Sequence, residues 1–146
     1  MKIRGFETIT LYPHLSLPTR ATAHSAGYDL AAAETVTLLP GEIKLIPTGM
    51  KAYMQENEVL YLYDRSSNPR KKGLVLINSV GVIDSDYYDN PENEGHIFAQ
   101  MKNITENAVT VEPCEHIVQA VFMPFLIADN DTATGNRDGG FGSTGD

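Results

Sequence analysis

The chain has 146 residues and a mass of 16.0 kDa, a length typical of one domain that can bury its own core. Its 19 acidic and 11 basic residues give a formal net charge of −8, which excludes the broad basic surface that duplex nucleic acid requires. The single cysteine, Cys114, cannot form an internal disulfide. No apolar run is long enough for a signal peptide or a membrane span. We therefore expect a cytoplasmic protein that binds neither nucleic acid nor membranes.

β-Strand patterns follow one another along the chain, whereas helical periodicity is hard to find. Residues 35–38 and 109–111 alternate between apolar and polar side chains, as half-buried strands do. Dense runs of β-branched, aromatic and aliphatic residues occupy 59–63, 74–77 and 117–122. Because turn signals containing proline or glycine separate these runs, the sequence predicts an all-β fold, in the form of a sandwich, jelly roll or barrel.

Two polar segments in the first half of the chain are candidates for chemistry. Residues 26–30 (Ala-Gly-Tyr-Asp-Leu), taken alone, indicate a turn entering a strand, with Asp29 capping local amides. Residues 64–73 follow the strongest strand and carry four of the eleven basic residues, with a helical turn or two predicted at 67–72. The arginine and serine side chains of this segment suit phosphate oxygens, and a solvated basic loop is the alternative.

A third segment, residues 78–87, places Asp84 at the end of an apolar strand. A carboxylate held there in a partly dry pocket could activate water. A simple cap between strand and turn is one alternative. A calcium loop is another, but Asp89 stands where the EF-hand pattern needs glycine.

The composition changes at Asp129, so we divide the chain into a β core, residues 1–128, and a tail, residues 129–146. The tail contains five glycines and one large apolar side chain, Phe141. Such a segment buries too little surface to offset the entropy of ordering it, which is typical of a frayed terminus. The alternative is a clasp, in which glycines let the backbone approach a ligand and the ring stacks on it.

Five segments in order resemble the conserved motifs of trimeric dUTP pyrophosphatases, and the resemblance extends from about Thr22 to the C-terminus. The segments are 26–29, 65–67, 81–87, 117–119 and 139–145. Each is weak alone, whereas five in the family's order and spacing are specific.

The resemblance implies a fold, an assembly and a reaction. The fold is a jelly-roll-like distorted β-barrel or sandwich, the β-clip of these enzymes, with at most one short helix and a flexible C-terminal tail. The assembly is a homotrimer in which each active site is built from three subunits. The reaction converts dUTP and water into dUMP and pyrophosphate, with Mg²⁺ bound mainly through the triphosphate, and it keeps uracil out of DNA and supplies dUMP for thymidylate synthesis.

The resemblance also implies a role for individual residues. Asp84 is the general base for water that attacks the α-phosphorus, and Tyr87 stacks on the deoxyribose and excludes a 2′-hydroxyl. Asp29 supports either the metal, only indirectly through its waters, or the phosphate-binding arginine. Uracil is read by Asn78, Gly81, Val82 and Ile83, and the phosphates are held by Arg65, Ser66 and Ser67. Gln119 contacts the α-phosphate. The tail places Arg137 at the γ-phosphate and Phe141 on uracil, and it also contributes Gly142, Ser143 and Thr144 to substrate binding.

The chain departs from the family pattern at four places. His116 and Asn136 stand where many members have arginine, and Cys114 stands where a turn glycine is common. The segment after Tyr87, residues 88–95, is longer and more acidic than usual, and we expect an extended hairpin near the mouth of the site.

Two other functions remain open from the sequence. A dCTP deaminase, or a bifunctional deaminase and pyrophosphatase, shares the fold and an Arg-Ser-Ser segment, and ammonia release from dCTP would distinguish it. A non-catalytic sensor that binds dUTP and signals to a partner protein is the second, although the retained Asp84 argues for catalysis.

Overall fold

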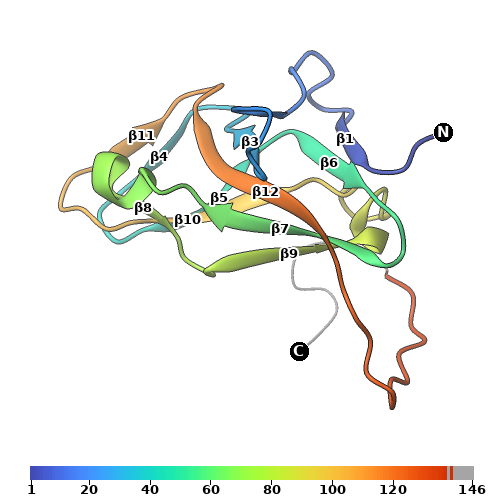
Figure 1. Ribbon diagram of the computed structural model, residues 1–146. Coiled ribbons are helices and arrows are strands. Elements are labelled where there is room, and N and C mark those ends of the chain that lie inside the picture. The colour runs from blue at the N-terminus through green and yellow to red at the C-terminus, as the bar shows by residue number, and fades with distance from the viewer. Residues whose placement is uncertain (138, 140–146) are drawn as a thin grey trace.

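A computed structural model describes residues 1–137 and 139, and most of its ordered elements are β-strands (Figure 1). No helix in this part of the chain is long and apolar enough to cross a membrane. The elements in chain order are β1 (Gly5–Thr8), β2 (Thr19–Arg20), β3 (Tyr28–Ala31), β4 (Val36–Leu38), β5 (Ile43–Pro47), β6 (Met50–Tyr53), β7 (Glu58–Asp64), η1 (Asn68–Lys72), β8 (Leu74–Leu76), β9 (Val80–Asp84), η2 (Ser85–Tyr87), β10 (Phe98–Asn103), β11 (Val109–Val111) and β12 (His116–Pro124).

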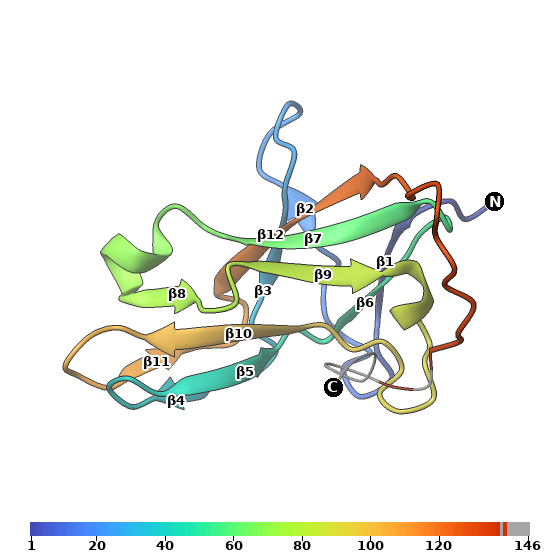
Figure 2. The same ribbon diagram turned by 90° about the horizontal axis from the view of Figure 1, so that it is seen from below.

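The strands form one large sheet and three small ones, and every pairing between them is antiparallel. The large sheet has the order β2-β3-β12-β7-β9, and the small ones are β5-β10-β8, β1-β6 and β11-β4. In both Figure 1 and Figure 2, β12, β7 and β9 run side by side, and Figure 2 shows β10 and β5 in a second layer next to β9. The predicted all-β, jelly-roll-like class is therefore confirmed.

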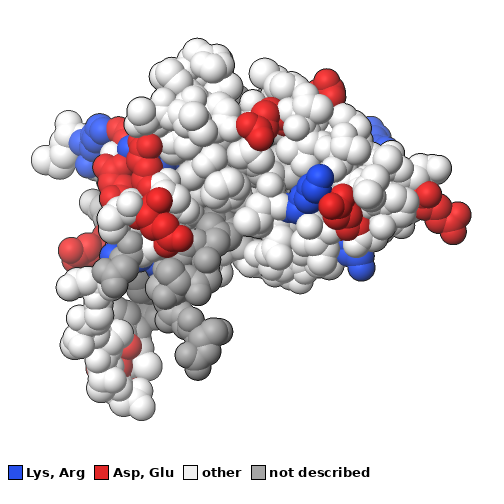
Figure 3. Space-filling model, turned by 180° about the vertical axis from the view of Figure 1, so that it is seen from behind, with Lys and Arg blue, Asp and Glu red and all other residues white. Residues whose placement is uncertain are grey.

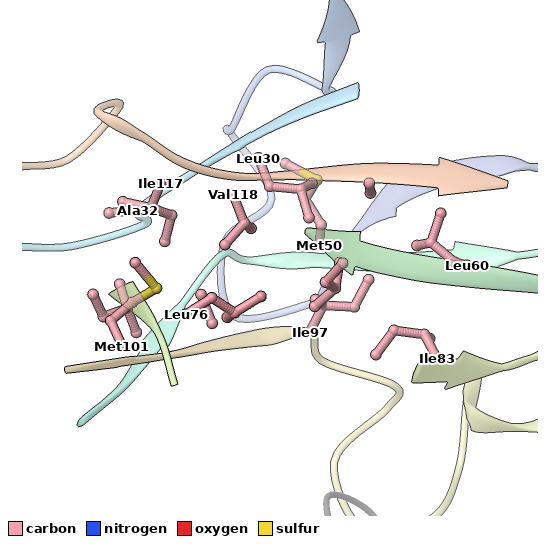
Figure 4. Close-up of a cluster of buried hydrophobic side chains, with 14 of the residues drawn as sticks. Leu30, Ala32, Met50, Leu60, Leu76, Ile83, Ile97, Met101, Ile117 and Val118 are labelled. Carbon is pink, nitrogen blue, oxygen red and sulfur yellow. The ribbon is translucent and has the colours of Figure 1, made fainter. Parts of the chain in front are cut away.

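The core lies between the large sheet and the small sheets. Figure 4 shows buried side chains from both layers meeting there, among them Leu30, Leu60 and Val118 from the large sheet and Leu76 and Met101 from a small one. All five are at most 5% exposed. Burying such side chains contributes about 1.5–3 kcal/mol each, which makes this interface the main source of stability.

The strands predicted from dense apolar runs are confirmed as β7, β8 and β12, and the alternating segments form β4 and β11. The helical turn predicted at 67–72 is η1, a π-helical turn, and η2 is a further 3₁₀ turn that the sequence did not indicate. Strands β5 and β6 were not predicted either, because these segments are extended through pairing with β10 and β1, and their local sequence carries no clear strand pattern. The boundary at residue 128 stays a prediction.

The predicted extended hairpin at 88–95 is wrong, because this segment is a compact loop of turns. It is held by Lys51, whose ammonium contacts Asp89 Oδ1 at 2.5 Å and Glu94 Oε2 at 2.9 Å. Burial disfavours the charge of Lys51, but these two carboxylates outweigh it and raise the lysine pKa. Asp89 and Glu94 both adopt positive φ angles, of 56° and 67°, so the chain curls back instead of extending.

The turn before β12 contains a strained residue. Cys114 is exposed and has a φ of 71°, in the left-handed region where a side chain is disfavoured. Its N–H donates to the Ala32 carbonyl at 2.9 Å, so pairing with the neighbouring segment fixes this conformation. The family's glycine would suit it better.

We predict that Cys114→Gly raises the free energy of unfolding by about 0.5–1 kcal/mol, because glycine adopts this conformation without the Cβ clash. Urea unfolding would measure the change. Gly41→Ala is the matched control, since Gly41 has a φ of 75° and an added Cβ would contact nothing within 4 Å. It should be destabilising, and a Cys114→Gly protein no more stable than wild type would contradict the strain.

Candidate active site

The predicted phosphate-binding residues gather where β7 ends, beside β3 and β12. Arg65 is half-buried and lies with Nε 3.4 Å from Asp29 Oδ1. It also donates from a terminal nitrogen to the His116 carbonyl, at 3.4 Å. We call this group the arginine–serine cluster; its members are Gly27, Asp29, Arg65, Ser66, Ser67 and Gln119.

Gln119 joins this cluster from β12. Its Nε2 donates to the Asp64 carbonyl at 3.1 Å, and its backbone is paired with Asp29 on β3 and Tyr63 on β7. Gly27 passes so close that an added Cβ would lie 2.4 Å from Gln119 Oε1. Glycine is therefore required at position 27 if Gln119 is to keep its place.

His116 occupies the position where many family members carry arginine. Its Nδ1 lies 3.9 Å from Asp29 Oδ2, so it adds an ion pair only when protonated. Its carbonyl accepts from Arg65 and from Lys72 Nζ, the latter at 2.6 Å. The substitution thus leaves Asp29 with Arg65 as its permanent cationic neighbour.

Asp84 lies at the end of β9, in a second group that we call the aspartate cluster: Asp84, Asp86, Tyr87 and Arg137. The side chain of Asp84 is 53% exposed, so the partly dry pocket predicted for it is not formed by this chain. Arg137 donates to Asp84 Oδ2 at 2.6 Å and to Asp86 Oδ1 at 2.7 Å. The predicted γ-phosphate ligand therefore pairs here with the predicted base.

Tyr87 is almost wholly buried, with 3% of its surface exposed. Its hydroxyl donates to the His96 carbonyl at 2.5 Å and accepts from Asn93 Nδ2 at 2.8 Å. Burial raises the pKa of Tyr87 to about 12, so the hydroxyl remains a donor near neutral pH. The Arg137 guanidinium lies 5.8 Å from the ring centre. Two hydrogen bonds thus hold the ring as a fixed wall beside Asp84.

The residues predicted to read uracil lie on β9 and the turn before it. Gly81 and Ile83 are buried, whereas Asn78 and Val82 are exposed. Strand β9 pairs with β7 along one edge only and is the last strand of the large sheet in the described part of the chain. Its outer edge therefore presents backbone donors and acceptors, which suits recognition of a flat polar ring.

The two clusters stand far apart on one chain. Tyr63 of β7 pairs with Gln119, and Val59 of β7 pairs with Asp84. Along the strand direction, Gln119 and Asp84 are therefore separated by four residues, or about 13 Å. Across the sheet they are separated by two strand spacings, or about 10 Å. One phosphate group cannot touch both side chains over such a distance.

Figure 3 shows acidic side chains gathered at the end of the molecule that carries β1 and η2. Within residues 1–137 and 139, however, no three His, Cys, Asp or Glu side chains are arranged to hold a metal ion. Asp29 contacts the cationic Arg65 instead. A single carboxylate paired with arginine supplies few direct ligands, so a divalent cation held beside it would have to keep most of its water ligands.

Several residues that shape the site were not singled out from the sequence. Asp64 and Asn68 bracket the arginine–serine turn at a spacing of four, and that spacing was the available signal. Asn93 and His96 act on Tyr87 through hydrogen bonds formed within the 88–95 loop and its exit, which no sequence pattern indicates. Phe141, Gly142, Ser143 and Thr144 lie outside the described residues.

The donors of the arginine–serine turn and the exposed Asp84 carboxylate suit a hydrolase that acts on a phosphate compound. A family model described as dUTPase matches residues 14–145. The chain is 67% identical to a deoxyuridine 5′-triphosphate nucleotidohydrolase of Lactococcus lactis subsp. lactis, with 99% of both chains covered. It is 42% identical to the same enzyme of Chromobacterium violaceum, with 89% of this chain and 88% of that one covered.

The chain therefore belongs to the dUTPase family, as the sequence motifs predicted. A crystal structure of dUTPase from Streptococcus mutans is 66% identical, with a TM-score of 0.83 over 86% of this chain and 99% of that chain. A dUTPase from phage phi11 of S. aureus, at 21% identity, has a TM-score of 0.75 over 92% of this chain and 97% of that chain and shows the shared fold.

His96 makes the site's stability dependent on pH. Burial lowers its pKa to about 4, from an ordinary value of 6.5, and its Nε2 accepts the Gly49 N–H at 2.9 Å. Because the depressed pKa means that the unfolded chain binds the proton first, stability is full above about pH 6.5 and is lost as the pH falls toward 4. The loss would reach up to about 3 kcal/mol.

His96→Gln tests this, since the glutamine oxygen can still accept from Gly49 but does not titrate. We predict that, when the pH is lowered from 7.5 to 4.5, wild type loses more unfolding free energy than His96→Gln does. Urea unfolding at both pH values would measure the two losses. Other acids titrate in both proteins and cancel. Parallel pH profiles would contradict the assignment.

Proposed function

We propose that this chain hydrolyses dUTP to dUMP and pyrophosphate, by attack of water on the α-phosphorus, in a homotrimer whose sites are shared between subunits. Membership of the dUTPase family supports the substrate. The separation of Gln119 from Asp84 supports the shared site, because both residues are assigned to the α-phosphate and one chain holds them too far apart. A neighbouring chain must therefore supply one of the two.

In this proposal the arginine–serine cluster binds the triphosphate. The Arg65 guanidinium and the hydroxyls of Ser66 and Ser67 supply donors, and Asp29 orients Arg65 from 3.4 Å. Gln119 contacts the α-phosphate. Hydrolysis of a phosphoanhydride depends mainly on positioning and on stabilising charge, so these donors carry much of the catalysis.

Asp84 acts as the general base and takes a proton from the attacking water on a carboxylate oxygen. Arg137 now occupies Oδ2, so it has to move before that oxygen can take the proton, and the γ-phosphate is its proposed destination. Docking of a second subunit over the exposed carboxylate would supply the dry surroundings that a base requires. Phe141 of the tail, with Gly142, Ser143 and Thr144, would then close the site.

Recognition of the nucleoside follows from β9 and Tyr87. Backbone groups of Gly81, Val82 and Ile83, together with Asn78, would pair with uracil, and cytosine would cover these groups without pairing with them. The Tyr87 ring, fixed by its two hydrogen bonds, would stack on the deoxyribose and leave no space for a 2′-hydroxyl.

We assign Mg²⁺ to the substrate triphosphate, with Asp29 supporting it only through water. The ion would stabilise charge on the phosphate oxygens. A structural Mg(II) ion is coordinated in a mutant dUTPase from phage phi11 of S. aureus. In the cell, the reaction would keep uracil out of DNA and supply dUMP for thymidylate synthesis, in the cytoplasm and without nucleic acid or membrane partners.

Substrate choice tests the proposal most directly. Pyrophosphate release should be faster for dUTP than for dCTP, dTTP or UTP, on the order of 100-fold or more, and should require Mg²⁺. Comparable rates on all four nucleotides would contradict the specificity. Release of ammonia from dCTP would instead favour a deaminase.

Mixed assemblies test the shared site. Asp84→Asn alone should bind dUTP but lose most turnover, and Arg65→Ala alone should bind it poorly. When the two inactive chains are refolded together, about one quarter of the sites should contain neither substitution, because each site draws these residues from different subunits. Activity should therefore return to about one quarter of wild type. A mixture no more active than its parents would mean that one chain supplies both residues.

A further inference from the structure

The turn that carries Arg65, Ser66 and Ser67 is tied to its surroundings by one carboxylate. Asp64 Oδ1 accepts the Arg65 N–H at 2.9 Å and Asn68 Nδ2 at 2.6 Å, and Oδ2 accepts the Leu76 N–H at 3.0 Å. The carboxylate therefore connects Arg65, which begins the turn, with Asn68, which follows the turn, and with strand β8. Bonds to a charged acceptor are stronger than those between neutral groups.

Asn68 makes the second connection. It is fully buried, and its Nδ2 donates to the Ile117 carbonyl at 2.6 Å as well as to Asp64. Its N–H donates to the Arg65 carbonyl at 3.0 Å, which closes the turn. One side chain thus links the end of the turn to β12, the strand that carries Gln119.

The Asp64 backbone completes the arrangement. Its carbonyl accepts Gln119 Nε2 at 3.1 Å, so the residue that anchors the turn also fixes the side chain assigned to the α-phosphate. The Asn68 Oδ1 is buried and has no hydrogen-bond partner among the described residues. An unpaired buried amide oxygen is unfavourable, which indicates that the amide is present for its two donated bonds.

We propose that Asp64 and Asn68 are positioning residues, which set the arginine–serine turn and Gln119 in a fixed relation so that they bind successive phosphates of one nucleotide. The inference rests on the proposed function, because it assumes that this cluster holds the phosphates. Neither side chain needs to touch the nucleotide. Their effect is geometric, and a misplacement of about 1 Å in such a site can reduce the rate about 100-fold.

Asp64→Asn is the sharpest test, because it keeps the shape of the side chain but presents an N–H to one of the donors now bound. Asn68→Ala removes the other half of the connection. Both should lower kcat/KM for dUTP by about 10- to 100-fold. The double variant should lose no more than the worse single variant, since both changes break the same connection.

Binding separates a positioning role from a general loss of stability. The affinity for dUpNHpp, a triphosphate analogue, should fall more than the affinity for dUMP, which lacks the outer phosphates. Asn103→Ala is the matched control, because Asn103 is also fully buried and its Nδ2 also donates two hydrogen bonds, in this case to the Leu38 and Asn107 carbonyls. It should be destabilised but should keep kcat/KM and both affinities.

Wild-type activity on dUTP is measured first, so that failure of the proposed function is recognised separately. With that activity present, variants that match wild type in kcat/KM would overturn the inference. So would equal losses of affinity for dUpNHpp and dUMP, or an equal loss of kcat/KM in Asn103→Ala. Asn68→Ser, which shortens the side chain but keeps it polar, replaces Asp64→Asn if that variant does not fold.

Discussion

The antiparallel pairing of β7 with both β12 and β9 is the constraint on which the site depends. This register places Gln119 beside Tyr63 and Asp84 beside Val59, so the two clusters sit at different ends of the same strand. A shift of one residue would turn the buried side chains of β7 toward solvent. The packing of the core therefore fixes the separation of the clusters, which is the observation that supports the proposed shared site.

The sheets fix the positions of the strands, and hydrogen bonds from buried polar groups fix the irregular segments between them. Asp64 and Asn68 hold one turn, and the His96 carbonyl with Asn93 holds Tyr87, in each case by bonds to backbone or amide groups. Lys51 holds the 88–95 loop between two carboxylates. Such networks are costly to break in part, so each keeps a short irregular segment in one arrangement.

The sequence predicted the elements better than their relations. The apolar run that became β7 and the Arg65–Ser67 motif after it were visible because both are local. The contact of Asp84 with Arg137 was not, since it joins residues more than 50 positions apart. The 88–95 loop was misjudged because a lysine on β6 determines its shape. Roles for single residues came from the family resemblance and remain predictions.

The contact of Arg137 with Asp84 and Asp86 makes the tail a tethered competitor. Arg137 is joined to Pro124, the end of β12, by a short stretch of chain, so its local concentration is set by chain length and not by how much protein is present. A ligand that binds Asp84 Oδ2 competes with the guanidinium for that oxygen. This competition weakens as salt screens the ion pairs of Arg137 with Asp84 and Asp86.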